Sequence, residues 1–380
     1  MMAKLGDICS IKSGFAFKSE YFSTTGVPVI RISNITTNGV DVDYSVCYDD
    51  AFWIKNPNYR VGKGDILVAM SGATVGKSCI NNLDVPLLLN QRVASITCDC
   101  DVTQKYVYHI INSDFFLKHI IQNSEGCAQP NISVKQLANF RLSIPDAPLR
   151  RQIVSTLDEL DSIVNARKQQ LSKLDELVKS RFIEMFGDLE RTTTIARYIS
   201  ELRGGKSLAG TEPCKNKVLK TGAATFGWFD PEQYKYLPTD YEPLPEHKVE
   251  TGDVIISRMN TPELVGACSY VFEAPDDMYY PDRLWKAVLK ENTNPIFLWQ
   301  LLWDRDVRKA IKESSGGTSG TMHNISKPNL LAIKCIDSPI ELQNEYAEFV
   351  KQTDKSKLAI QQSLEKLETL KKALMQKYFG

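Results

Sequence analysis

The sequence predicts a mixed fold of the α/β (α+β) class, with two duplicated domains and two long helices that form an antiparallel coiled coil. Three observations predict it. Short motifs recur about 190 residues apart along the chain. Short β-type runs precede helical stretches in both halves. Two long segments carry apolar residues on alternating three- and four-residue steps.

The duplication is visible in motifs that keep their order in both halves. They are Gly64-Asp65-Ile66 and Gly252-Asp253-Val254, Asn131-Ile132-Ser133 and Asn324-Ile325-Ser326, and Met185-Phe186-Gly187 and Tyr378-Phe379-Gly380. The offset between copies drifts slightly, as small loop insertions produce. A period this long indicates duplicated domains rather than a solenoid.

Within each copy the predicted elements follow one order. The β-type runs come first; they are "VPVIRIS", "GDILVAM" and "RVASITC", and then "NKVLKTG", "GDVIISRM" and "WKAVL". A helical stretch, a polar Gly-containing loop, a short strand and a long helix follow. The predicted boundaries are 1–147 and 188–338 for the mixed domains and 148–187 and 339–380 for the helical regions.

The two long helices have the clearest periodicity. Pro148 and Pro339 near their starts, and Gly187 and Gly380 at their ends, are typical of helix termini. A helix of about 35 residues is roughly 50 Å long. Because a long apolar stripe needs a partner, we expect an antiparallel pair rather than two separate surface helices. The expected seam residues are Leu157, Leu160, Val164, Leu171, Leu174, Val178, Ile360, Leu364, Leu367, Leu370 and Leu374.

Composition excludes several classes of protein. With 43% hydrophobic and 24% charged residues, the 380-residue chain is typical of globular proteins. No apolar run is long enough for a membrane span, and the first residues lack a signal-peptide core, so we expect a cytoplasmic protein. Nine cysteines without a CxxC pair do not indicate zinc. An odd number of cysteines in an unsecreted chain predicts reduced thiols in a cytoplasm. Because 46 basic residues balance 46 acidic ones, any nucleic-acid surface must be local.

Two short motifs resemble catalytic sites and fall short of them. "GDILVAMSGATVGKS", residues 64–78, ends like a phosphate-binding P-loop, but Ser71 stands where the first glycine is required and Gly72 makes the loop one residue too short. "NPNY", residues 56–59, approaches the motif of adenine methyltransferases, with Asn58 in place of the second proline. We expect an ordinary turn and an ordinary loop.

The order of motifs resembles the specificity subunits of type I restriction–modification systems over essentially the whole chain. The matching segments are "LGDICSIKSGF", "VPVIRISNI", "GDILVAMSGATVGKS", "LLLNQRVASI", "QPNISVKQLANFRLSIP" and "RRQIVSTLDELDSIV". The resemblance implies two target-recognition domains on paired helices, which bind the two halves of a split double-stranded DNA target. The second copy departs most from the family pattern, which leaves its contact residues less defined.

The same resemblance implies the partners. Two modification (methyltransferase) subunits and restriction (endonuclease) subunits would join the chain, carrying S-adenosylmethionine, ATP and Mg, while the chain itself would hold no catalytic residue, cofactor or metal. The junction segments 148–154 and 339–349 are candidate docking surfaces. Two alternatives stay open at this point: a two-headed coiled-coil scaffold that does not recognise DNA, and a DNA methyltransferase or NTPase in its own right.

Candidate DNA contacts are polar residues of the loops and strand ends, since Arg and Lys recognise guanine, Asn and Gln recognise adenine, and Ser and Thr bind phosphate. In the first domain they are Lys12, Ser13, Lys18, Arg31, Asn34, Ser71, Thr74, Lys77, Gln91, Arg92, Gln129 and Asn131. In the second they are Arg203, Lys206, Lys220, Thr221, Arg258, Asn260, Arg283, Ser315, Thr318, Ser319, His323 and Asn324. A solvated hairpin turn explains Lys77 equally well, and Arg92 could equally anchor a buried carboxylate.

Overall fold

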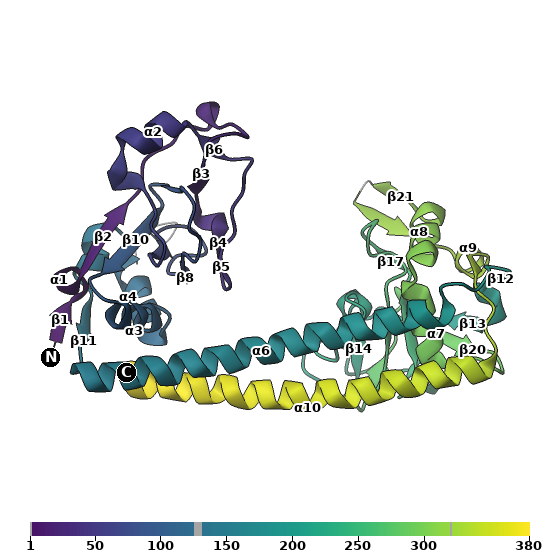
Figure 1. Ribbon diagram of the computed structural model, residues 1–380. Helices are drawn as coiled ribbons and strands as arrows, with labels where there is room; N and C mark the ends of the chain where they lie inside the picture. The colour runs from purple at the N-terminus through teal and green to yellow at the C-terminus, as the bar shows by residue number, and fades with distance from the viewer. Residues whose placement is uncertain (1, 125–130, 320) are drawn as a thin grey trace. The chain divides into compact units, whose positions relative to one another are not determined.

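The computed structural model describes residues 2–124, 131–319 and 321–380, and these form two compact units (Figure 1). Unit 1 comprises Met1–Lys168 with Gln362–Gly380, and unit 2 comprises Gln169–Gln361. Both units mix strands with helices, which confirms the predicted fold class. The two longest helices are α6 (Ala147–Phe186) and α10 (Ile340–Phe379), and each belongs partly to both units.

Unit 1 begins with strands and ends with helices. Its further elements are β1 (Met2–Lys4), α1 (Leu5–Ile8), β2 (Cys9–Ser13), β3 (Val27–Ile30), β4 (Ile35–Thr36), β5 (Gly39–Val40), β6 (Cys47–Tyr48), α2 (Asp50–Lys55), β7 (Ile66–Ala69), β8 (Ser78–Ile80), β9 (Leu88–Leu89), β10 (Val93–Cys98), α3 (Asp101–Ile111), α4 (Asp114–Ser124), α5 (Val134–Ala138) and β11 (Arg141–Ser143).

Unit 2 also has its strands before most of its helices, and it has two further strands after its second helix. Its elements are β12 (Thr193–Thr194), β13 (Ile199–Arg203), β14 (Lys217–Leu219), β15 (Tyr234–Tyr236), β16 (Val254–Ser257), β17 (Met259–Asn260), β18 (Cys268–Tyr270), β19 (Met278–Tyr279), β20 (Leu284–Leu289), α7 (Pro295–Trp303), α8 (Arg305–Ser314), β21 (Gly316–Ser319), β22 (Met322–Asn324), α9 (Lys327–Leu331) and β23 (Lys334–Cys335).

The central sheets of the two units have the same topology. Four antiparallel strands lie in the order β2-β10-β7-β8 in unit 1 and β13-β20-β16-β18 in unit 2. The six runs predicted as strands contain β3, β7, β10, β14, β16 and most of β20. This shared topology supports the duplication inferred from the motifs.

Each central sheet is covered on both faces. In β7, Ile66 and Val68 pack into the core formed with α3 and α4, while Leu67 and Ala69 pack into a second core with β3 and β9. Successive side chains of a strand point to opposite faces, so an uninterrupted apolar run fits a strand buried on both sides. The sheet is therefore a rigid base for the loops at its edges.

The long helices pair within each unit. In unit 1 an ion pair joins Lys168 to Glu368 at 2.9 Å, and a second joins Asp161 to Lys371. In unit 2, Arg181 pairs with Glu345 at 3.1 Å, and Asp175 pairs with Lys357. Residue numbers rise along α6 as they fall along α10, so the pairing is antiparallel, as predicted (Figure 1).

The expected seam residues are buried or half-buried, with one exception. Leu157, Leu160, Val164 and Val178 are buried, while Leu171, Leu174, Ile360, Leu364, Leu367 and Leu374 are half-buried. The placement of Leu370 in the seam is wrong, because its side chain is 50% exposed. The neighbouring Lys371 turns inward instead, where it meets Asp161. A charged pair thus interrupts the apolar stripe at this turn of the helix.

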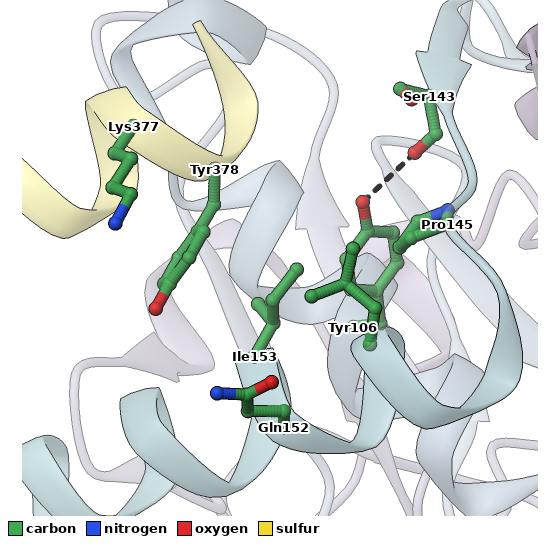
Figure 2. A pocket seen from close by; sticks show the side chains of 8 residues that line it. Tyr106, Ser143, Pro145, Gln152, Ile153, Lys377 and Tyr378 are labelled. Carbon is green, nitrogen blue, oxygen red and sulfur yellow. Dashed lines mark hydrogen bonds between the residues drawn. The ribbon is translucent and has the colours of Figure 1, made fainter.

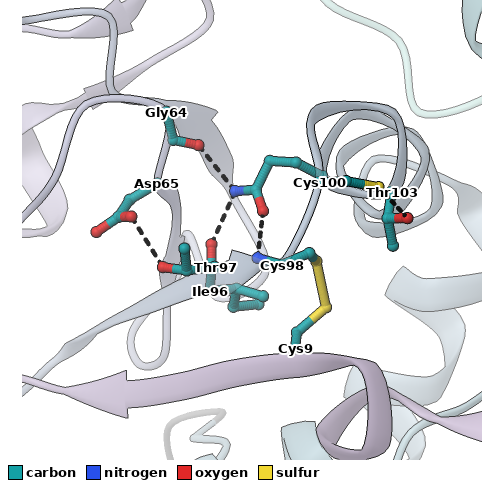
Figure 3. The surroundings of a disulfide bond; sticks show 9 residues. Cys9, Gly64, Asp65, Ile96, Thr97, Cys98, Cys100 and Thr103 are labelled. Atoms are coloured by element: carbon teal, nitrogen blue, oxygen red, sulfur yellow. Dashed lines mark hydrogen bonds between the residues drawn. A yellow bond between two sulfur atoms is a disulfide. The ribbon is translucent and has the colours of Figure 1, made fainter.

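One cysteine pair departs from the expected reduced thiols. Cys9 and Cys98 face each other across β2 and β10, with Cα atoms 4.4 Å apart, and form a disulfide (Figure 3). The prediction rested on the odd cysteine count, which carries no information on which side chains meet across strands. Among the described residues, Cys47, Cys79, Cys100, Cys214, Cys268 and Cys335 are free thiols.

Candidate functional site

The glycine-rich segment after β7 is a hairpin turn. It connects β7 to the antiparallel strand β8, which begins at Ser78. Gly72 and Gly76 have φ angles of +82° and +85°, values that favour glycine, and the backbone N–H of Gly76 donates to Ala69 at 2.9 Å. A P-loop requires a helix where β8 stands, so the expected ordinary turn is confirmed.

Three segments of unit 1 meet at the end of β7. The N–H of Met70 donates to the carbonyl of Arg92 at 2.9 Å, and the N–H of Ile132 donates to the carbonyl of Met70 at 2.8 Å. Ser71 and Asn131 form an isolated β-bridge. We call residues 70–77, 90–92 and 131–132 loop cluster 1. Its exposed side chains are Thr74, Lys77, Gln91, Arg92 and Asn131.

Unit 2 builds the same junction at the end of β16. The N–H of Arg258 donates to the carbonyl of Arg283 at 3.0 Å, and the N–H of Ile325 donates to the carbonyl of Arg258 at 3.1 Å. Strands β17 and β22 continue the contact, pairing Asn260 with His323. Residues 258–266, 283 and 322–325 form loop cluster 2.

The shared backbone frame makes candidate residues of the two units equivalent. Arg92 and Arg283 each lie one residue before the central strand β10 or β20, and Asn131 and Asn324 each precede the isoleucine that bonds to the junction. In unit 2 the Arg258 Nε also donates to Asn324 Oδ1 at 3.2 Å. The duplicated Asn-Ile-Ser motif already related Asn131 to Asn324. Sequence reasoning missed the equivalence of Arg92 and Arg283, although an alignment of the two halves would have indicated it.

The aspartates of the duplicated Gly-Asp motif are tied into the core of each unit. Asp65, at the start of β7, accepts from Ser95 Oγ at 2.7 Å. It also accepts from Thr97 Oγ1 at 2.8 Å (Figure 3). Asp253, at the start of β16, is buried and pairs with Lys286 at 2.9 Å. The two aspartates of the duplicated motif thus lie at the opposite ends of their strands from the loop clusters. These two carboxylates are therefore not placed to neutralise the basic residues of the loop clusters, although in loop cluster 2 the Glu263 carboxylate pairs with Lys312.

Other candidates of unit 1 lie outside loop cluster 1. Lys12 Nζ donates to the carbonyl of Arg60 at 2.8 Å, and Arg31 pairs with Asp43 at 3.0 Å. Ser13 is half-buried on β2, and Lys18 is exposed beside Glu20. The choice of Asn34 as a DNA contact is wrong: its buried amide donates to Asp41 at 2.7 Å and accepts from the N–H of Arg31, closing a turn.

In unit 2, several candidates line a pocket of about 230 Å³. Lys220, Thr221 and Arg283 surround it together with Lys235, which sequence reasoning did not select. Lys235 lies on β15, whose short run carried no signal apart from its basic charge. Three basic side chains around one small pocket are suited to bind phosphate oxygens.

Several of the remaining candidates of unit 2 contact neighbouring side chains. Arg203 pairs with Glu201 at 2.7 Å, and this contact lowers the pKa of the Glu201 carboxyl. Lys206 Nζ lies 5.8 Å from the ring centroid of Tyr241. Ser315 Oγ lies 3.0 Å from His323 Nδ1. Thr318 and Ser319 lie on β21, and Gln129 lies outside the described residues.

The segment "NPNY" is an ordinary loop, as expected. Asn56 Nδ2 donates to the carbonyl of Phe52 at 2.9 Å, and the Tyr59 ring packs against Phe52 and Phe15 at centroid distances of 6.2 and 5.4 Å. Both side chains are therefore used in local packing. Within the described ranges, no group of three His, Cys, Asp or Glu residues is placed to hold a metal ion.

The family model for the "Type I restriction modification DNA specificity domain" matches residues 1–175. The specificity subunit of the type I restriction enzyme EcoKI of Escherichia coli K12 is 21% identical over 414 residues, which cover 100% of this chain and 88% of that protein. Over its whole length the chain is similar to the specificity subunits of type I restriction–modification systems, and residues 1–175 match their DNA specificity domain. The specificity subunit of EcoBI, from Escherichia coli, is 28% identical over 181 residues, or 46% of this chain and 35% of that protein.

Solved structures share the fold of this chain over its whole length. The crystal structure of the type I restriction–modification S subunit from M. genitalium aligns with a TM-score of 0.60 at 15% identity, covering 100% of this chain and 96% of that one. A chain from a study of type I complex assembly and conformational transition aligns with a TM-score of 0.54 at 16% identity, covering 100% and 97%. The described helices include none that is long and apolar enough to span a bilayer.

Proposed function

We propose that this chain is a specificity subunit that recognises a split double-stranded DNA target, with one half-site bound by each loop cluster. The observation that carries the proposal is the repeated junction that brings an Arg and an Asn to equivalent places in both units, Arg92 and Asn131 in one and Arg283 and Asn324 in the other. Arginine recognises guanine and asparagine recognises adenine through paired hydrogen bonds in the major groove. Different neighbours, such as Met70 and Arg258, would give the two units different half-sites.

The two long helices support a target that is split into two half-sites. Because α6 and α10 are unbroken over 40 residues each and belong partly to both units, we propose that the gap between the half-sites is constant. Contacts in both half-sites contribute to one binding event, so each unit needs only modest affinity.

The subunit in this proposal has no catalytic residue and scaffolds its partners in the cytoplasm. Two modification (methyltransferase) subunits and the restriction subunits would supply the chemistry, with S-adenosylmethionine, ATP and Mg. A docking site for one modification subunit is the pocket of about 390 Å³ at the start of α6, lined by Tyr106, Leu149, Ile153 and Tyr378 (Figure 2). Leu149 is an exposed residue of this lining. Large apolar side chains of this kind are common anchors at protein interfaces.

The test is to co-express the chain with its modification subunit in a host without adenine methylation and to map methyladenine across the host DNA. A split motif with a constant gap supports the proposal. Methylation of one contiguous half-site means that only one unit recognises DNA. A stable complex that neither methylates nor binds DNA with a salt-dependent affinity favours the scaffold alternative. Methylation or nucleotide hydrolysis by the isolated chain favours an enzyme.

A further inference from the structure

Unit 2 carries two aromatic residues on a turn whose counterpart in unit 1 has none. After β14, the short 3-10 helix η5 (Thr221–Ala224) leads into Phe226-Gly227-Trp228. Unit 1 has the same turn after β3, where η2 (Ile32–Asn34) leads into Thr37-Asn38-Gly39. Equivalent backbone hydrogen bonds close the two turns. The N–H of Asp230 donates to the carbonyl of Ala223 at 3.0 Å, and the N–H of Asp41 donates to the carbonyl of Asn34 at 2.8 Å.

The two rings are exposed although the base of the turn is fixed. Phe226 is 71% exposed and Trp228 is 56% exposed. Between them, Gly227 has a φ of +84°, and a Cβ there would lie 3.4 Å from the Trp303 ring. Thr225 is buried, and its Oγ1 donates to the carbonyl of Thr221 at 2.9 Å. Two large apolar rings are thus held in water on an ordered base, an arrangement that indicates a binding surface.

The aromatic turn adjoins loop cluster 2. Asn260 Nδ2 donates to Thr225 Oγ1 at 3.4 Å, which links the base of the turn directly to β17. Arg258 lies two residues before Asn260, and the exposed Lys220 precedes η5. The base of the aromatic turn is therefore bonded to the surface that the proposed function assigns to the second half-site, and the exposed Lys220 caps the 3-10 helix that leads into the turn.

We propose that Phe226 and Trp228 stack on bases of the second half-site that are unstacked when the complex binds DNA. This proposal rests on the proposed function. Base–aromatic stacking needs an exposed π-face beside a basic groove, and apolar side chains inserted at base steps bend a duplex. A protein partner fits less well, because modification subunits that dock on related surfaces of both units would need the feature twice. In unit 1 the equivalent turn carries Thr37 and Asn38.

The experiment uses the complex of the full chain with its modification subunit and duplexes that carry the methylation motif mapped for the wild type. The test variant is Phe226→Ala/Trp228→Ala, and the matched control is Thr37→Ala/Asn38→Ala in the equivalent turn. We expect the test variant to bind the full target about tenfold to a hundredfold more weakly. The control and Trp228→Phe, which keeps a ring, stay within about threefold of the wild type. The slope of affinity against salt stays unchanged, because the rings neutralise no phosphate.

Two further measurements separate the possible outcomes. A duplex with the second half-site scrambled should bind the wild type and the test variant with equal affinity. In the intact second half-site, 2-aminopurine placed at one base position reports changes in stacking, and its fluorescence should change on binding the wild type but not the test variant. Unchanged affinity of the test variant for the full target overturns the proposal. Weaker binding of the test variant to the modification subunit also overturns it, because the rings then contact that protein rather than DNA. If the wild type binds scrambled and intact duplexes alike, the proposed function itself fails.

Discussion

At two leucines predicted for the helical seam, the structure can be tested against the periodic pattern of the sequence. Leu157 of α6 and Leu370 of α10 fit the apolar repeat equally well, yet Leu157 is fully buried among side chains of unit 1 and Leu370 is half exposed. Truncating a fully buried leucine removes its transfer free energy and leaves a cavity, so Leu157→Ala should lower the free energy of unfolding by about 2–5 kcal/mol. Leu370→Ala leaves no cavity and should cost below about 1 kcal/mol.

The assay is urea unfolding followed by circular dichroism, with the first transition extrapolated linearly to water. Both leucines belong to unit 1, so each variant reports on the same cooperative unit. Leu364→Ala, at a half-buried position, should fall between the two. Equal costs for Leu157→Ala and Leu370→Ala would refute the assignment of Lys371, rather than Leu370, to the inward position.

Three other predictions follow from the contacts described above. Arg92→Ala and Arg258→Ala should each relax recognition in one half-site at a cost of about 1–3 kcal/mol where the contact is bidentate, measured by methyladenine mapping; unchanged specificity would remove that residue from the interface. Hydrogen bonds from His109, at 2.7 Å, and Lys105 lower the pKa of Asp158 below 3.8, so its stabilisation is present above that pH and is lost as the pH falls through the lowered pKa. Asp158→Asn should therefore destabilise the protein near pH 7, by no more than about 1 kcal/mol because the side chain is 38% exposed, and should match the wild type at the acid end of a urea series. Cys9→Ser should destabilise the oxidised protein by about 2–4 kcal/mol and leave the protein in dithiothreitol unaffected; equal stability of both oxidised proteins would exclude the Cys9–Cys98 bond.

Local pattern was sufficient for the elements and for the duplication. Strand-length apolar runs, helix periodicity and recurring motifs depend on neighbours in the chain, so β7, β16 and the two long helices lie where the sequence predicts them. The near miss of the P-loop could also be recognised by counting, because the spacing of its glycines is a local property. Candidate contacts were harder to select, since residue type alone does not distinguish an exposed amide from a buried one.

The amino-acid sequence by itself determined the fold class, the two repeated units, the antiparallel helices and the resemblance to type I specificity subunits. Only the tertiary structure decided that Asn34 is buried in a turn, that Lys371 displaces Leu370 from the seam, and that Cys9 meets Cys98 across two strands. It alone joined Arg92 with Ser71 and Asn131, and Arg283 with Arg258 and Asn324. The physical reason is that these outcomes depend on backbone hydrogen bonds and packing between residues far apart in the chain, to which local propensity does not respond.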